Sequence, residues 1–153
     1  MPRRGAFLAL LALAGCGLSP VYGTGGAGSA LFDNTAYVTP ATEAGFAMRK
    51  QLETRLGVAQ VSSFQLTTTI AEARDAAAVT SDGDITRFSI LGVADWVLAQ
   101  DEQTVATGTV ETFTSYAATG STVATQAAED AAVARLALAL ADLIVADVLL
   151  ATP

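Results

Sequence analysis

The sequence predicts an α+β fold, with a mostly antiparallel sheet of about four strands and two helices packed on one face, after a cleaved lipoprotein signal. Three observations lead to this fold class. Apolar residues recur at helical spacing in residues 40–56, and residues 124–150 are rich in Ala and Leu without Gly or Pro. The segments between them alternate apolar and polar residues and are joined by short polar turns, which is typical of adjacent antiparallel strands. An apolar leader ends at the single cysteine.

Residues 1–15 have the features of a bacterial lipoprotein signal. Two arginines precede a short apolar run, as in a secretory signal. That run is too short for a transmembrane helix, which needs about 20 apolar residues. Leu13, Ala14 and Gly15 lead to Cys16 as in a lipobox, in which the thiol is acylated and the peptide is cut before the cysteine. We therefore predict that Leu13, Ala14 and Gly15 are the signal-peptidase recognition residues. Cys16 is the predicted lipidation site and membrane anchor.

The composition excludes several classes of function. Cleavage before Cys16 would leave 138 of the 153 residues, a length that suits one domain. This mature chain would carry six basic side chains and fifteen acidic ones, which gives a net charge of −9. Such a surface repels nucleic acid, so we expect no nucleic-acid partner. The chain has no histidine and no second cysteine, which removes the usual general base, most nucleophile pairs and most metal sites. We therefore expect no enzyme, no catalytic residue, no metal and no cofactor.

The sequence of the mature chain predicts a tether followed by one domain. Residues 16–30 are rich in Gly, Ser and Thr and are expected to form a lipidated flexible tether, followed by a single domain over residues 31–153. A polar turn that includes residues 81–84 lacks the spacing of a calcium loop, so we expect an exposed hairpin connection there. Gly108 is expected to mark a bulge. The expected strands cover residues 31–38, 64–71, 85–99 and 104–116.

The first helix has sequence signals at both of its ends. Thr39 can cap the exposed amides, and Pro40 suits the first helical position because its missing N–H has no partner there. Gly57 is a natural stop at the other end. We therefore expect an amphipathic helix that starts at Pro40 and packs on the sheet.

The second helix is expected to follow a cap at Ser121 or Thr122. Arg135, Asp142 and Asp147 interrupt its apolar stretch, and each would be costly at bilayer depth. We therefore expect this helix to pack on the core rather than cross a membrane. Ala and Leu reach nearly all round it, so we hypothesise that its spare apolar surface meets a partner protein.

Both ends of the mature chain resemble one protein family. Residues 16–23 read Cys-Gly-Leu-Ser-Pro-Val-Tyr-Gly, residues 135–137 read Arg-Leu-Ala, and residues 140–144 read Leu-Ala-Asp-Leu-Ile. These segments are similar to the start and the closing helix of the alphaproteobacterial lipopolysaccharide-assembly lipoproteins of the LptE type. The order lipobox, tether, strand, helix, three strands and helix also fits this family across nearly the whole mature chain.

The resemblance implies a lipid-anchored protein at the periplasmic face of the outer membrane. Members of the family lodge in the lumen of the large outer-membrane β-barrel that inserts lipopolysaccharide into the outer leaflet, and they act as its plug and assembly partner. This role supports lipopolysaccharide transport, and some members contact lipopolysaccharide directly. Gly17 after Cys16 is compatible with sorting to the outer membrane. The implied partners are the β-barrel, the membrane through the Cys16 lipid, and lipopolysaccharide.

The low number of basic residues departs from what a phosphorylated glycolipid would require. Arg74 and Arg87 flank the acidic turn and are the candidate glycolipid contacts, provided that they converge at a hairpin end. The alternative, which we favour, is that they are solvated surface charges that pair with Asp75, Asp82 or Asp84.

Two other functions stay open from the sequence. An auxiliary lipoprotein of an ABC-type lipid transport system would share the lipobox and the α+β body. A periplasmic module for an apolar ligand would need an internal cavity lined by Phe64, Phe88 and Trp96, although these aromatic residues are more simply read as core.

Overall fold

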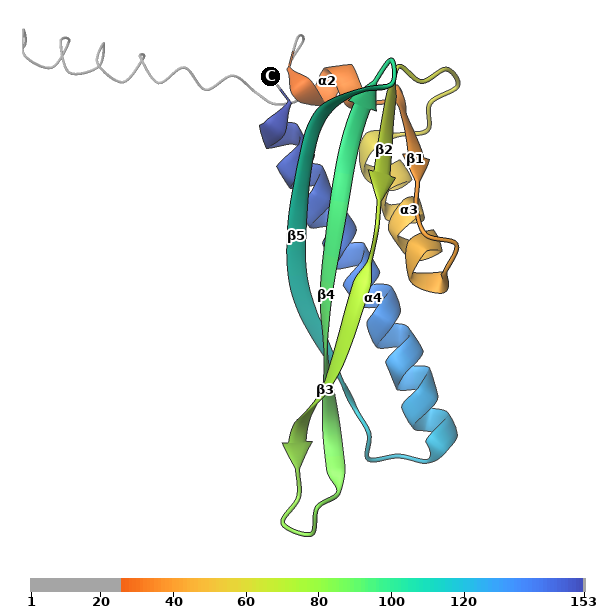
Figure 1. Cartoon of the computed structure of the whole chain (residues 1–153). Helices are drawn as coiled ribbons and strands as arrows, with labels where there is room; N and C mark the ends of the chain where they lie inside the picture. The colour runs from red at the N-terminus through yellow and green to blue at the C-terminus, as the bar shows by residue number, and fades with distance from the viewer. Residues whose placement is uncertain (1–25, 153) are drawn as a thin grey trace, which may run out of the picture.

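A five-stranded sheet and a long C-terminal helix make up most of the described chain (Figure 1). The computed structural model describes residues 26–152, so the predicted signal peptide, Cys16 and most of the predicted tether lie outside the described residues. The elements in chain order are α2 (Ala27–Leu31), β1 (Thr35–Val38), α3 (Glu43–Leu56), β2 (Phe64–Thr68), β3 (Ala71–Val79), β4 (Ile85–Gln100), β5 (Gln103–Ala117) and α4 (Thr122–Ala151). These strands and helices confirm the predicted α+β class.

β4 is the central strand of the sheet and pairs with three other strands. β5 pairs with it antiparallel along its length, from Arg87 opposite Ala117 to Gln100 opposite Gln103. On the other side of β4, β2 pairs with the end of the strand and β3 with its first part, both antiparallel. β1 then pairs with β2 in parallel. The sheet is therefore mostly antiparallel, as predicted, with one parallel pair.

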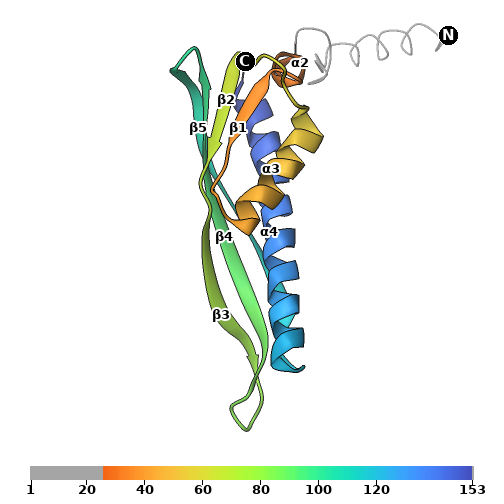
Figure 2. The ribbon, with the colours of Figure 1, turned by 90° about the vertical axis from the view of Figure 1, so that its right-hand side faces the viewer.

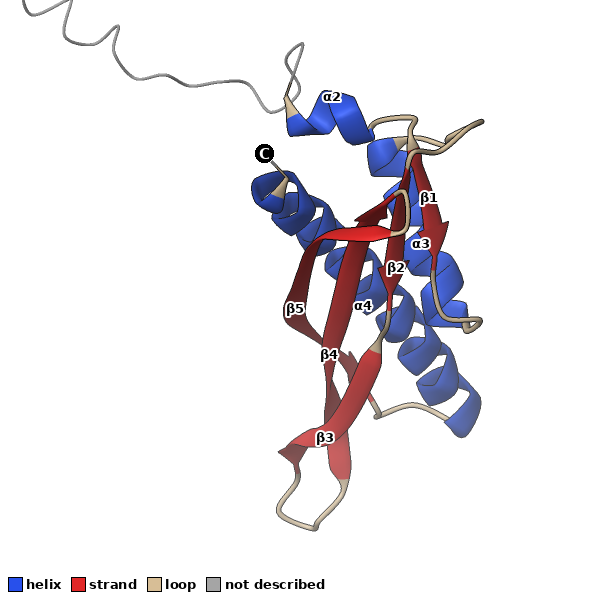
Figure 3. Ribbon diagram, turned by 45° about the horizontal axis from the view of Figure 1, so that its top comes forward, coloured by secondary structure: helices blue, strands red, loops and turns tan. Residues whose placement is uncertain are grey.

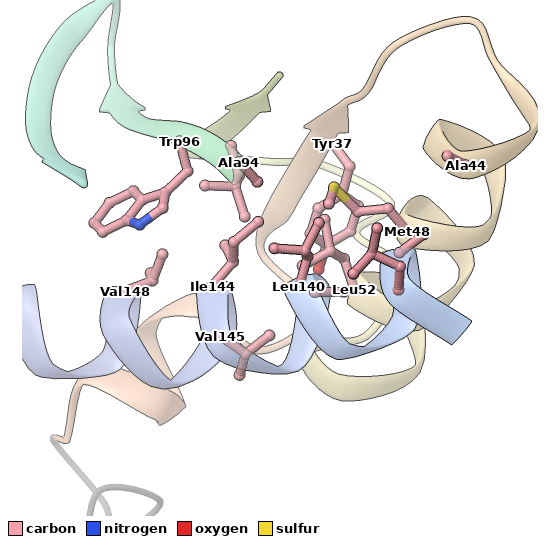
Figure 4. Packing of buried hydrophobic residues seen from close by; sticks show 14 of the residues in the cluster. Tyr37, Ala44, Met48, Leu52, Ala94, Trp96, Leu140, Ile144, Val145 and Val148 are labelled. Carbon is pink, nitrogen blue, oxygen red and sulfur yellow. The ribbon is translucent and has the colours of Figure 1, made fainter. Parts of the chain in front are cut away.

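α3 and α4 lie on one face of the sheet, and no helix of residues 26–152 covers the opposite face (Figure 2). Successive side chains of a strand point to opposite faces, and along β4 the alternate residues from Ile90 to Leu98 face the helices and are buried. The core lies between the two layers, and Figure 4 shows Trp96 and Ala94 of the sheet opposite Leu140, Ile144 and Val148 of α4.

β1 and β2 form the one parallel pair among the described strands. Parallel strands need a crossover connection, and α3 supplies it between them. A helix between two strands is the sequence signal of such a unit. The expected antiparallel succession concerned the strands between residues 64 and 116, and it holds there, since β2, β3 and β5 all pair antiparallel with β4.

Two elements form where no such element was expected. β3 occupies residues 71–79, at the end of an expected strand and in the expected turn, and it consists mostly of exposed Ala and charged residues. Such residues have low strand propensity, so pairing with β4 decides this conformation. α2 occupies the end of the expected tether and the start of the first expected strand. Its Leu31 is fully buried, and the Thr35 hydroxyl donates to the Leu31 carbonyl oxygen at 2.9 Å.

The helix caps differ partly from those expected. α3 begins at Glu43 rather than Pro40, and its cap is Thr42, whose hydroxyl accepts from the Gly45 amide at 3.1 Å. A Cβ on Gly45 would overlap the Pro40 carbonyl, so the chain before α3 lies against its first turn. At the other end Gly57 adopts φ 79°, which confirms the expected stop.

α4 begins after Ser121, whose hydroxyl accepts from the Ala124 amide at 3.3 Å. This confirms one of the two expected caps, and the helix covers 30 residues. None of the helices in residues 26–152 combines the length and the apolar character that a membrane crossing requires.

Gly108 does not mark the expected bulge, since it pairs in register with Trp96. The irregularity in this ladder lies elsewhere, between Leu98 and Ala99. The Trp96 indole N–H donates to Asp147 of α4 at 3.0 Å. A Cβ on Gly108 would lie 2.7 Å from the Trp96 ring. The missing side chain therefore leaves room for the indole and its hydrogen bond.

Candidate functional site

The predicted lipidation site cannot be placed against the fold. Leu13, Ala14, Gly15 and Cys16 lie outside the described residues, so their roles stay predictions. The described chain starts at Gly26, directly before α2, and α2 is anchored by the buried Leu31.

Arg74 is engaged by side chains of the protein itself. Its Nη1 donates to the Tyr116 hydroxyl at 3.3 Å and pairs with Glu129 of α4. Its guanidinium lies 5.3 Å from the centre of the Phe88 ring, and Phe88 stacks on Tyr116 with 5.5 Å between ring centres. The hydrogen bond to Tyr116 and the charge of Glu129 raise the pKa of Arg74. Arg74 thus joins β3 to the sheet and to α4.

Arg87 lies on the opposite face of the sheet from Arg74. Arg74 is paired with Ile90, which faces the helices, whereas Arg87 is three residues away from Ile90 along β4 and so points to the other face. Its Nη1 donates to the Ser115 hydroxyl at 3.2 Å. The structure therefore does not bring the two candidate glycolipid contacts together.

The favoured alternative for these arginines also needs correction. Of Asp75, Asp82 and Asp84, none forms an ion pair within residues 26–152, and the carboxylate that pairs with Arg74 is Glu129. Glu129 lies 55 positions further along the chain. Local sequence distance could not identify that partner, because α4 brings it to β3 only in the folded protein.

Polar contacts also hold α3 in place. Asp142 of α4 accepts from Arg55 Nε and from Gln51 Nε2, both at 2.8 Å. The hydrogen bond from Arg55 lowers the pKa of Asp142, against the effect of its partial burial. The Tyr37 hydroxyl of β1 donates to the Gly57 carbonyl oxygen at 3.0 Å, and burial raises the pKa of Tyr37 to about 12. These contacts join α3 to α4 and β1 to the end of α3.

The open face of the sheet carries the exposed apolar row that sequence reasoning missed. Ala73, Leu91 and Phe113 are cross-strand neighbours on β3, β4 and β5. Leu91 is 43% exposed and Phe113 is 75% exposed. Val97 and Val38 add partly exposed apolar area further along this face. The sequence held one signal for this row, because Phe113 falls on the polar side of an alternating strand.

Carboxylates flank this row. Asp75, Asp95 and Glu111 are exposed on the open face, and Arg87 is the one basic side chain there within the described strands. The face therefore combines an apolar centre with a negative surround, which suits a basic partner surface and repels an acidic one.

The C-terminal helix exposes less continuous apolar surface than expected. Its main stripe packs against the sheet, with Leu140, Ile144 and Val148 fully buried. Its large exposed apolar residues are spread along its length at Val123, Leu138, Leu143 and Leu150. The hypothesis that this helix meets a partner is not tested by the structure.

The three aromatic residues proposed to line a ligand cavity lie in the core layer. Trp96 and Phe64 are 1% and 9% exposed, and Phe88 stacks on Tyr116. Phe64 also borders a surface hollow of about 510 Å³ whose other walls include Ser62, Gln65 and two acidic residues of the β4–β5 turn. An open polar hollow of this kind does not provide an apolar binding cavity.

Several solved structures with a similar fold are bacterial lipoproteins. A Caulobacter crescentus protein described as a lipoprotein is 24% identical, with a TM-score of 0.68, over 84% of this chain and 96% of that chain. Rare lipoprotein B from Shewanella oneidensis has a TM-score of 0.57 and 12% identity over 74% and 90% of the two chains. A minor lipoprotein from Acinetobacter baumannii has a TM-score of 0.55 and 12% identity over 78% and 92%. No family model and no curated protein matches the sequence. The chain therefore has the fold of these bacterial lipoproteins.

Proposed function

We propose that this protein is an outer-membrane lipoprotein that plugs the lipopolysaccharide-inserting β-barrel and assists its assembly. Cys16 carries the lipid, and the folded domain lies on the periplasmic face of the membrane. In this role it supports the transport of lipopolysaccharide to the outer leaflet without performing chemistry itself.

The similarity of the fold to rare lipoprotein B and other bacterial lipoproteins is the observation that carries this proposal. The lipobox at Cys16 supplies the anchor that such a role needs. The open sheet face, with Leu91 and Phe113 exposed, supplies surface for a protein partner. Phe64 and Trp96 belong to the hydrophobic core and Phe88 packs against it, which favours an interaction protein over a ligand carrier.

A direct glycolipid role for Arg74 and Arg87 draws less support. Arg74 already contacts Tyr116 and Glu129, and Arg87 lies on the other face of the sheet. We expect the double substitution Arg74→Ala with Arg87→Ala to leave lipopolysaccharide binding unchanged. A clear loss of binding in a folded double variant would restore these arginines as contacts.

The test is recovery of the barrel with the tagged full-length protein from outer membranes solubilised in mild detergent. We expect a large β-barrel in stoichiometric amount after stringent washing, identified by mass spectrometry. A Cys16→Ser variant serves as the control, because it cannot be acylated and should not fractionate with the outer membrane. Recovery of an ATPase system instead, or of no barrel, would contradict the proposal.

A further inference from the structure

Among the strands of residues 26–152, the sheet has three free edges, and two of them are protected against pairing with another chain. β1 is only four residues long. β3 carries Glu72, Arg74 and Asp75 and has two register irregularities near its end. Short length, charges and bulges are the usual ways in which proteins block an exposed edge.

β5 is the third edge, and it lacks these protections. It covers fifteen residues, is rich in Thr and Val, and contains no Pro, Lys or Arg. Glu111 is its one charged residue. Figure 3 shows β5 as the outermost strand on the side of the sheet away from β1. A long strand of this composition at an edge is a ready template for a further strand.

The register shows which backbone groups of β5 point outward. Ala118, directly after β5, donates its backbone N–H to the carbonyl oxygen of Thr86 in β4 at 2.9 Å. In an antiparallel pair, the backbone N–H and C=O groups of successive residues point alternately toward and away from the neighbouring strand. The backbone groups that point away from β4 are therefore those of Thr107, Thr109, Glu111, Phe113 and Ser115.

An independent contact agrees with this assignment. Arg135 of α4 donates to the Ser115 carbonyl oxygen at 3.3 Å and so covers the far end of the edge. Within residues 26–152, the outward backbone groups from residue 107 to residue 113 make no hydrogen bond. The free part of the edge therefore ends before Ser115, whose carbonyl oxygen is bound by Arg135.

We propose that this free edge, residues 107–113 of β5, binds an extended segment of the partner protein as an added strand of the sheet. The inference rests on the proposed function, since the partner is the β-barrel protein named there. Main-chain hydrogen bonds supply affinity in this mode of recognition, and alternate side chains supply specificity. Phe113 is 75% exposed on the open face of this edge strand, and an added strand would cover the side of Phe113 that faces away from β4.

Charge indicates which segment would bind. Glu111 lies in the middle of the free edge, and Asp95 of β4 lies on the same face beside it. A partner segment with Lys or Arg near Glu111 and an apolar residue near Phe113 complements this edge. A second copy of this chain does not, because two strongly acidic molecules would bring their edges together.

Thr107→Pro in the full-length lipidated chain is the decisive variant. Proline at an outward position removes the N–H that an added strand needs and leaves the ladder to β4 intact. Thr107→Ala is the matched control, since it changes the same exposed side chain and keeps the N–H. We expect Thr107→Pro to reduce recovery of the barrel at least ~tenfold and Thr107→Ala less than ~twofold.

Hydrogen exchange of the backbone amides provides a second readout that does not depend on a variant. Exchange in the β5 segment should slow when the wild-type chain is in complex with the barrel, whereas exchange at the β3 edge should not. Equal recovery of the barrel by wild type and Thr107→Pro, or unchanged β5 exchange in the complex, would overturn the inference and leave the proposed function standing. Failure of the wild-type chain to recover the barrel would overturn both. Dimers that form in detergent and are lost in Thr107→Pro would assign the edge to a second copy instead.

Discussion

Gly108→Ala tests the reasoning about the packing of the sheet against α4. Gly108 faces the indole of Trp96, and the indole N–H donates to Asp147 of α4 at 3.0 Å. An Ala Cβ would lie 2.7 Å from two ring carbons of Trp96 and 2.5 Å from an oxygen of Asp147. Both neighbours would have to move, and the hydrogen bond between them would be lost.

The expected loss of stability follows from three contributions. Overpacking a filled core site costs about 1–3 kcal/mol. Losing a hydrogen bond to a charged group costs about 1.5–3 kcal/mol. Replacing Gly by Ala lowers the entropy of the unfolded chain, which offsets about 0.4–1 kcal/mol. We therefore expect Gly108→Ala to lower the free energy of unfolding by about 2–6 kcal/mol, with a decrease in Tm of about 4 °C per kcal/mol.

Urea unfolding followed by tryptophan fluorescence measures this change directly, because Trp96 is the one tryptophan of the chain. Gly120→Ala is the control: its nearest neighbour would be the Ala124 Cβ at 3.1 Å, at an exposed position before α4. We expect that variant to unfold within about 0.5 kcal/mol of wild type. A Gly108→Ala protein as stable as the control, with unchanged native fluorescence, would refute the account of this site.

Three further predictions concern the N-terminal cap of α3 and the two side chains, Asp142 and Tyr37, whose pKa values are shifted in the folded protein. Thr42→Ala should lower the free energy of unfolding by about 1 kcal/mol, whereas Thr39→Ala should have little effect, since Thr42 caps α3; chemical denaturation distinguishes the two, and equal losses would contradict the observed cap. Because Arg55 lowers the pKa of Asp142 in the folded state, this carboxylate stabilises the protein above its unfolded-state pKa, and the contribution is lost as the pH falls through the folded-state pKa. Asp142→Asn should therefore cost less than about 1 kcal/mol near neutral pH, and its difference from wild type should vanish in acid; a difference that persists there would refute the linkage. The pKa of Tyr37 is raised to about 12 by burial, so its stabilising effect is present below the unfolded-state value and is lost as the pH rises toward 12. Burial raises the pKa of Tyr116 as well, so ultraviolet titration should show late phenolate ionisation that Tyr37→Phe reduces, and a high-pH titration that this substitution leaves unchanged would contradict the prediction.

Local patterns predicted a large part of the fold. The composition of residues 124–150 is sufficient for a helix, and α4 covers Thr122–Ala151. Gly57 ends α3 because its positive φ suits a residue without a Cβ. Local patterns failed for β3, where exposed Ala and charged residues form a strand only because β4 offers a pairing partner. They also failed at the start of α3, where Thr39-Pro40 and Thr42 are both good caps and the packing of Pro40 against Gly45 decides between them.

By itself, the sequence determined the predicted lipid anchor at Cys16, the acidic charge and the fold class, because each of these depends on neighbouring residues or on composition. Tertiary structure alone decided which side chains pair and which residues are exposed on the surface. It paired Arg74 with Glu129 across 55 positions and placed Arg87 on the opposite face. It also left the row around Phe113 and the edge of β5 uncovered. The physical reason is that exposure and pairing depend on which segments meet in space, and residues far apart in the chain set them.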